Sequence, residues 1–284
     1  MNKFDLEFDK EKFGLEIEFA SVKSDNVIKM LSSIEPNNEE EFNTWTFSRE
    51  TFSEIRKGSI FGGEIASPIL SNDEKSLNDL KYVLKKLKKL NATTNGNQSL
   101  QVRVSNDIFE ENNKYVYNFL KLYYAYEDII YKFGYNGGNP RESITTFAKP
   151  CDYKLQTILN AHYDSISFYS YISFINMVLL KKQHGLDFHD RNNPNMPKSF
   201  EFRMFNATFD FKTVLNEVNT VIALIKRAKN DIDMELINER INEAKYKPTN
   251  YFSAMKNDKA KEFANIIFDD EKSVNKFMMQ YKKR

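Results

Sequence analysis

Apolar and polar residues alternate in several short stretches of the chain, with a two-residue period that is typical of strands with one buried face. The clearest example is GLEIEFA, in which Leu15, Ile17 and Phe19 share one face while Glu16 and Glu18 share the other. The same alternation, bounded by turn residues, predicts further strands at 44–52, 62–70, 99–105 and 199–211.

A helical period replaces the alternation in the other apolar stretches. In SLNDLKYVLKKLKKL, at 76–90, the leucines recur every three or four residues and the lysines fall mostly on the opposite side. The next helix is predicted to begin with Asp107 as its cap and to end at Gly134. The same period predicts a second long helix over parts of 152–182, a helix at 212–230, and shorter helices near 233–244 and 258–283.

The order of these elements favours the α+β class, because strands and helices mix without a regular βαβ rhythm. There is no internal repeat and no Pro- or Gly-rich linker. The pattern therefore predicts an α+β domain at residues 1–230 and a helical C-terminal extension at 231–284 that packs on the same domain.

Composition and charge narrow the class of protein. The 284 residues are 41% hydrophobic and 14% aromatic, which is enough apolar material for a packed core. Lysine and arginine (41) balance aspartate and glutamate (40), so a nucleic-acid partner is not expected. The single cysteine, the lack of an apolar signal sequence and an interrupted apolar run at 168–180 predict a cytosolic protein without a membrane segment.

The polar faces of the predicted strands carry charged residues that would lie together if the strands are neighbours. Glu16, Glu18, Glu64 and Glu201 would then share one face with Arg103 and Arg203. Carboxylates this close repel one another unless a cation or a shared proton relieves them, and such oxygen-rich groups suit Mg²⁺ or Mn²⁺ with phosphates. The alternative is the ordinary solvated face of an antiparallel sheet.

Three other groups of residues have a chemical interpretation and a simpler structural one. His184, His189 and neighbouring aspartates, in HGLDFHD, could chelate a metal, but the segment 184–199 is rich in turn residues and reads as a loop that closes over the site. Cys151 could be a nucleophile or a small buried thiol. The stretch YNGGNPR, at 135–141, could hold phosphate on its backbone or be a plain loop.

The ordered motifs GLEIEF, GGEIASP, LQVRV and FEFRMFNAT resemble the amidoligase family, in the superfamily of carboxylate-amine ligases that includes glutamine synthetase and glutamate-cysteine ligase. Weaker similarities are Trp45, the stretch NPRESITTFAKP and the stretch YISFINM, and the resemblance covers about 12–225. It implies a glutamine synthetase-like catalytic fold, with helices around an antiparallel sheet curved into a half-barrel. It also implies that ATP and two or three divalent ions bind the concave face.

The resemblance assigns roles residue by residue. It implies that the metal ligands are Glu16, Glu18, Glu64 and Glu201. Arg203 matches an arginine that meets phosphate, and Arg141 matches an arginine before the FAKP stretch. The implied reaction phosphorylates a carboxylate with ATP and then joins it to an amine, on a small amino acid or peptide substrate.

One departure affects this assignment. Where the family has H-V-H-V, this chain has Gln101-Val102-Arg103-Val104, so both histidines are missing. Gln101 can still offer a carbonyl oxygen to a cation. Arg103 cannot bind metal, so it would replace one cation or bind phosphate, as a catalytic and nucleotide-binding residue. Two functions remain open: an ATP-dependent ligase, and a catalytically degenerate amidoligase-fold protein that binds a nucleotide or a protein.

Overall fold

Six strands form a single open sheet in the part of the chain that the structure describes. All neighbouring strands are antiparallel, in the order β2-β3-β1-β4-β6-β5. The computed structural model describes residues 6, 8, 10–34, 44–49, 62–94, 96–161, 163–179, 183–189, 199–244 and 255–283. The strands are β1 (Phe13–Ala20), β2 (Thr46–Ser48), β3 (Gly62–Ala66), β4 (Ser99–Ser105), β5 (Leu186–His189) and β6 (Ser199–Asn206).

Five of these strands lie where alternation predicts them, and β5 corrects a prediction. The segment 184–199 was expected to be a loop, but its residues Leu186–His189 pair with β6. Leu186 and Phe188 are buried in the core, as the inward residues of a strand are. Four residues are too few for the alternation to stand out from the turn residues around them. Residues 190–198 lie outside the described part of the chain, and with them most of the predicted closing loop.

Most of the helices lie where the apolar period predicts them, but those at 24–31 and 144–147 were not predicted, and the long helix predicted within 152–182 is two shorter ones. They are α1 (Ser24–Leu31), α2 (Glu74–Lys89), α3 (Asn113–Gly134), α4 (Ile144–Phe147), α5 (Asp152–Leu159), α6 (Phe168–Leu179), α7 (Phe211–Arg227), α8 (Met234–Ala244), α9 (Asn257–Ile267) and α10 (Glu271–Tyr281). None of the helices in the described residues has both the length and the apolar character that a bilayer crossing requires.

The start of α3 corrects a second prediction. Asp107 was expected to cap this helix, but it lies in a short 3-10 helix, Asn106–Phe109. Glu110 follows with φ 53°, in the left-handed region, which ends that turn. The cap of α3 is Asn112, whose side chain accepts a hydrogen bond from the backbone of Lys114 at 2.9 Å.

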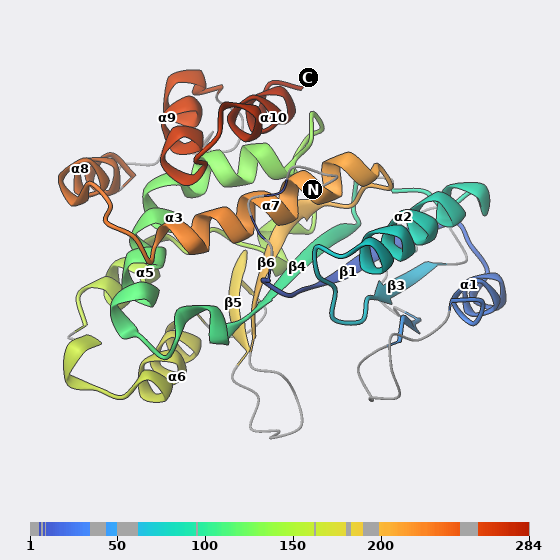
Figure 1. The fold of residues 1–284 in the computed structure, drawn as a ribbon, viewed down its shortest axis with the longest axis horizontal. Coiled ribbons are helices and arrows are strands. Elements are labelled where there is room, and N and C mark those ends of the chain that lie inside the picture. Colours follow the sequence, from blue (N-terminus) through green and yellow to red (C-terminus); the bar gives the residue numbers. More distant parts are fainter. Residues whose placement is uncertain are drawn as a thin grey trace.

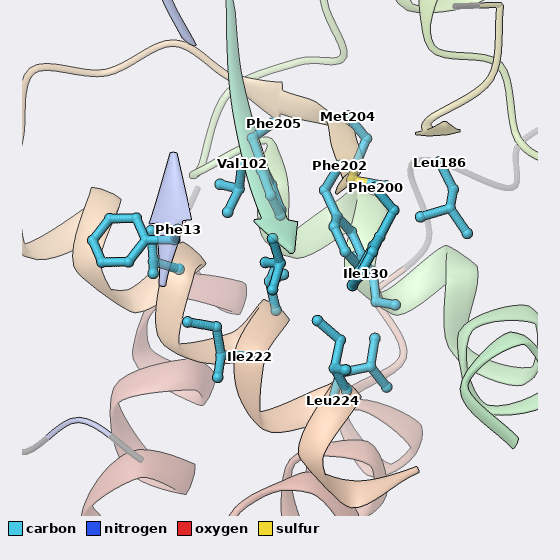
Figure 2. Close-up of a cluster of buried hydrophobic side chains, with 14 of the residues drawn as sticks. Phe13, Val102, Ile130, Leu186, Phe200, Phe202, Met204, Phe205, Ile222 and Leu224 are labelled. Carbon is cyan, nitrogen blue, oxygen red and sulfur yellow. The ribbon is translucent and has the colours of Figure 1, made fainter. Parts of the chain in front are cut away.

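Helices α3 and α7 cover one face of the sheet (Figure 1). Figure 2 shows the resulting core, in which side chains from four strands meet side chains of α3 and α7. Those labelled are Phe13, Val102, Ile130, Leu186, Phe200, Phe202, Met204, Phe205, Ile222 and Leu224. Burying each such side chain contributes about 1.5–3 kcal/mol to folding, so this face determines the register of the strands.

The C-terminal helices pack on the outer side of α3 and α7 (Figure 1). Their contact with α3 centres on Tyr126, where the helix has non-helical φ −120° and ψ 16°. The Tyr126 hydroxyl donates to Glu262 of α9 at 2.6 Å, and Arg240 of α8 donates to both oxygens of Glu262 at 2.7 Å. Helices α8 and α9 are thereby tied to the same point of α3.

Candidate active site

The face of the sheet away from α3 and α7 brings the predicted site residues together. Glu18 of β1 lies directly opposite Glu64 of β3, and Arg103 of β4 lies opposite Glu201 of β6. Glu16 of β1 lies opposite Gln101 of β4, which is two residues before Arg103. Because residues opposite one another or two apart share a face, the four glutamates lie on one side of the sheet.

Arginines lie between the glutamates. Arg103 donates through Nε to Glu201 Oε1 at 3.0 Å, and its Nη2 lies 2.5 Å from Glu16 Oε1. Arg203 donates through Nη1 to the other oxygen of Glu201 at 2.6 Å. Glu201 is completely buried, so both arginines are held by a carboxylate that has no access to water.

These ion pairs determine the protonation state of the two arginines. Burial disfavours the charged form of Arg103, but Glu201 and Glu16 outweigh it and raise the pKa of Arg103. Burial opposes the charge of Arg203 in the same way, and Glu201 again raises its pKa. Both guanidinium groups therefore keep their charge at any pH at which the protein is folded.

Gln101 and Ser99 complete the middle of the site. Arg203 donates to the Gln101 side-chain carbonyl at 2.7 Å, so Gln101 orients an arginine. A bulge in β6 opposite Gln101 makes this contact, because the register shifts between Leu100 and Val102. The backbone of Ser99 donates to Glu18 Oε2 at 2.7 Å, which fixes one oxygen of that glutamate.

Arg141 contacts the site indirectly, through hydrogen bonds to the backbone of β6. Its Nη2 donates to the carbonyl of Arg203 at 2.6 Å and its Nη1 to the carbonyl of Phe205 at 2.9 Å. Its Nε donates to Ser143 at 3.0 Å, and burial lowers the pKa of Arg141 to about 10. Arg141 thus donates to carbonyl groups of β6 at positions beyond the part of β6 that pairs with β5. Its catalytic role stays a prediction, and the contacts shown hold Arg203 in position.

The glutamates share a face without forming one metal-binding group. Across the described residues, no three His, Cys, Asp or Glu side chains are arranged to hold a metal ion. The reason is that arginines occupy the space beside Glu16 and Glu201. Glu18 and Glu64 remain as a cross-strand pair, and two carboxylates are what Mg²⁺ uses when it also binds phosphate. Binding of a metal ion or a nucleotide at these carboxylates stays a prediction.

Asp187, which the sequence suggested only as a possible metal chelator beside His184 and His189, lies instead next to the arginines of the site. It lies opposite Glu201, is 2% exposed, and its charge helps raise the pKa of Arg203. The alternation of Leu186 and Phe188 around it was the available signal. The other candidates are not part of the site: His184 is buried with Nδ1 against the Leu179 carbonyl, and Cys151 is a buried thiol. His162 and the side chain of His189 are outside the described part.

The comparison with protein families agrees with this geometry. A family model described as "Putative amidoligase enzyme" matches residues 9–225, which includes all six strands. The chain belongs to this amidoligase family. A search of curated proteins gives no match.

The region that the amidoligase family model matches coincides with the sheet and its charged face. The matched region contains every charged residue of the polar face and ends within α7. It leaves out α8, α9 and α10, which lie on the far side of α3 and α7 from that face. The family match thus covers the sheet and the helices packed on it, and ligase activity is consistent with this match.

Proposed function

We propose that this amidoligase is an ATP-dependent carboxylate-amine ligase that acts on a small amino acid or peptide. The observation that supports this most is the row of carboxylates and arginines on one sheet face of an amidoligase chain. The proposal includes the curved, glutamine synthetase-like half-barrel, because a concave face would let the row surround a triphosphate.

The reaction needs two displacements. First, a substrate carboxylate oxygen attacks the γ-phosphorus of ATP, the bond to ADP breaks, and an acyl phosphate forms. Then the amine attacks the acyl carbon, the new C–N bond forms, inorganic phosphate leaves, and the amine loses a proton. Charge moves between oxygens in both steps, so the main requirement is fixed positive groups.

Arg103 and Arg203 are suited to that requirement. Their side chains are 29% and 12% exposed, so both reach the face while Glu201 holds them from below. A guanidinium already oriented by a buried carboxylate loses little entropy when it meets a phosphate. Gln101 adds orientation by accepting a hydrogen bond from Arg203.

The charge of the face indicates which partners it accepts. Among the residues that the structure describes, five carboxylates lie near three arginines, an excess of negative charge: Glu16, Glu18, Glu64, Asp187 and Glu201 against Arg103, Arg141 and Arg203. A triphosphate would be repelled unless it brings a divalent cation, and an ammonium group would be attracted. Glu18 and Glu64 would hold Mg²⁺ or Mn²⁺, which neutralises triphosphate oxygens when bound.

A second function is favoured by one observation, the contact of Arg103 with Glu16 at 2.5 Å. If that pair does not open for substrate, the fold would bind a nucleotide or a protein without catalysis. This catalytically degenerate protein is the alternative that the experiment must separate from the ligase.

The test is release of ADP from ATP and Mg²⁺ in the presence of mixed amino acids and dipeptides, with nucleotide binding measured by calorimetry. We expect ADP release that Glu18→Gln abolishes. The control is Glu239→Gln, at an exposed position of α8, which should keep full activity. Binding without ADP release would select the degenerate protein, and absence of nucleotide binding would overturn the ligase and leave only the protein-binding form of the alternative.

A further inference from the structure

We infer that the cleft between the end of α7 and one face of α9 binds a short acidic peptide with free ends, at a site separate from the charged sheet face. The cleft has a volume of about 460 Å³. Pockets for small molecules have volumes of about 300–1,000 Å³, so a ligand of this size fits. The lining consists of one residue of α7 and five of α9: Arg227, Asp258, Lys261, Glu262, Asn265 and Ile266.

The cleft lies outside the part of the chain that carries the family match. That match ends at residue 225, before Arg227, and does not include α9. Helix α9 packs on the far side of α3 and α7 from the charged sheet face (Figure 1). A ligand in the cleft would therefore be separated from that face by two helices, and the inference does not depend on the proposed ligase reaction.

Arg227 supplies a cation for a carboxylate of the ligand. Its side chain is 31% exposed, and its Nη1 lies 3.9 Å from an oxygen of Asp269, which is 86% exposed. So long a contact with an exposed partner contributes little. The Arg227 Nε is covered and has no hydrogen-bond partner among the described residues. The outer nitrogens of the guanidinium thus keep their capacity for a carboxylate, which they can bind through two parallel hydrogen bonds.

The side chains of α9 supply the opposite charge and a second cation. Within the described ranges, Asp258, Lys261 and Asn265 have no side-chain hydrogen bond or ion pair. Glu262 differ from them, because Arg240 donates to both of its oxygens and lowers its pKa, so its charge is already balanced. Two cations and one anion therefore remain, which complement a ligand with two carboxylates and one ammonium group.

The spacing of these charges favours a peptide over a single amino acid. Asp258 lies in the first turn of α9, whereas Arg227 is beside Asp269, just beyond the end of that helix. Asp258 and Asn265 are about 10 Å apart along the axis, at 1.5 Å per residue. An extended peptide covers at most about 3.3–3.6 Å per residue, so about three residues span this length. Its ammonium would meet Asp258, its terminal carboxylate Arg227, and an acidic side chain Lys261.

Calorimetry without nucleotide tests the inference, with the tripeptide alanyl-glutamyl-alanine as the probe. We expect the full chain to bind it, and binding to weaken at least tenfold when the amino end is acetylated or the carboxyl end is amidated. Alanyl-alanyl-alanine, which lacks the acidic side chain, should also bind more weakly. Absence of probe binding at about 1 mM, or equal binding of the blocked peptides, would overturn the inference.

Variants of the cleft locate the bound peptide. Arg227→Gln and Asp258→Asn should each weaken binding by roughly tenfold to a hundredfold, because each removes the charge that meets one end of the peptide. The matched controls are Lys226→Gln on α7 and Glu271→Gln in the first turn of α10, which remove charges that do not line the cleft and should leave binding unchanged. Unchanged binding in Arg227→Gln and Asp258→Asn would contradict the inference.

A variant of the sheet face separates this site from the proposed catalytic one. Glu18→Gln should bind the probe as the parent chain does. Binding that is lost in Glu18→Gln and kept in Arg227→Gln would place the peptide on the sheet face and overturn the inference. ADP release is not part of this measurement, so a chain that binds the peptide in the cleft without any turnover would refute the ligase and leave this inference standing.

Discussion

At the scale of single residues, Glu201 is the residue to which both arginines of the polar face bond. Each of its oxygens bonds to a different arginine, and the residue is fully buried. Buried ion pairs of this kind add little net stability, because desolvation offsets their attraction, but they are costly to break. Glu201 therefore determines where the two guanidinium groups lie.

Glu201→Gln should destabilise the protein by about 3–5 kcal/mol, because an amide can accept from only one arginine and its NH₂ group faces the other. Urea unfolding of parent and variant measures the loss. The control is Asp79→Asn, at the exposed pair with Lys75 on α2, which should cost less than about 1 kcal/mol. Equal losses in the two variants would show that the buried pair is no more costly to break than a surface one.

Alternation alone places Glu16, Glu18, Glu64 and Glu201 on one face, and the registers confirm that placement. It does not reveal that Arg103 lies between two of them, because that depends on which strands are neighbours and on how long side chains turn. The bulge in β6 is likewise a property of two paired strands and cannot be seen in either one.

At the scale of elements, α3 and β6 come unusually close behind the site. Gly134, the last residue of α3, faces Phe205 of β6, and a Cβ there would lie 2.6 Å from the ring and 3.3 Å from the Phe205 Cα. Phe205 lies next to the bulge, and its carbonyl is held by Arg141. The helix end and the strand therefore support one another where Arg203 is positioned.

Gly134→Ala should lower stability by about 1–3 kcal/mol, through overpacking against Phe205. This reverses the usual sign, since alanine normally improves a helix by about 1 kcal/mol over glycine. Urea unfolding checks it, with Lys85→Ala on the exposed side of α2 as the control that should change stability by less than about 0.5 kcal/mol. Stabilisation by Gly134→Ala would contradict the close approach.

The sequence predictions are wrong mainly at the ends of elements and for the shortest elements. Asp107 and Asn112 are both good caps, and the left-handed backbone at Glu110 and Glu111 separates the short 3-10 helix from α3. The apolar run within 152–182 divides into α5 and α6 because a polar turn separates them. The long elements, α2, α7 and β4, are predicted well because their periods repeat several times.

At the scale of the whole molecule, α10 closes over α7 around a buried carboxyl group. Glu217 of α7 is fully buried, and Gln280 of α10 donates to its Oε1 at 3.2 Å. Among the described residues its Oε2 has no hydrogen-bond partner. Burial raises the pKa of Glu217 well above its usual 4.5. The protein therefore folds with this group protonated.

Glu217→Gln should remove a pH dependence of stability. In the parent chain the folded state binds a proton that the unfolded state releases above 4.5, so stability falls as pH rises from there, by at most about 1.4 kcal/mol per pH unit. The variant keeps an acceptor for Gln280 and cannot ionise, so it should be more stable at pH 8 and nearly equal to the parent at pH 4.5. Urea unfolding at the two values measures the difference; a parallel pH dependence in both proteins would contradict it.

The strand order has a consequence for the chain while it is being made. Arg103 and Glu201 are 98 residues apart in sequence, and Glu16 precedes both. At about 5–20 residues per second, a ribosome would take roughly 10–40 seconds between adding Glu16 and adding Glu201. Throughout that interval β1 exists without β6 or α7, so the part of the core that these two elements supply forms last. The charged face is therefore completed late in synthesis, only after Glu201 has been added.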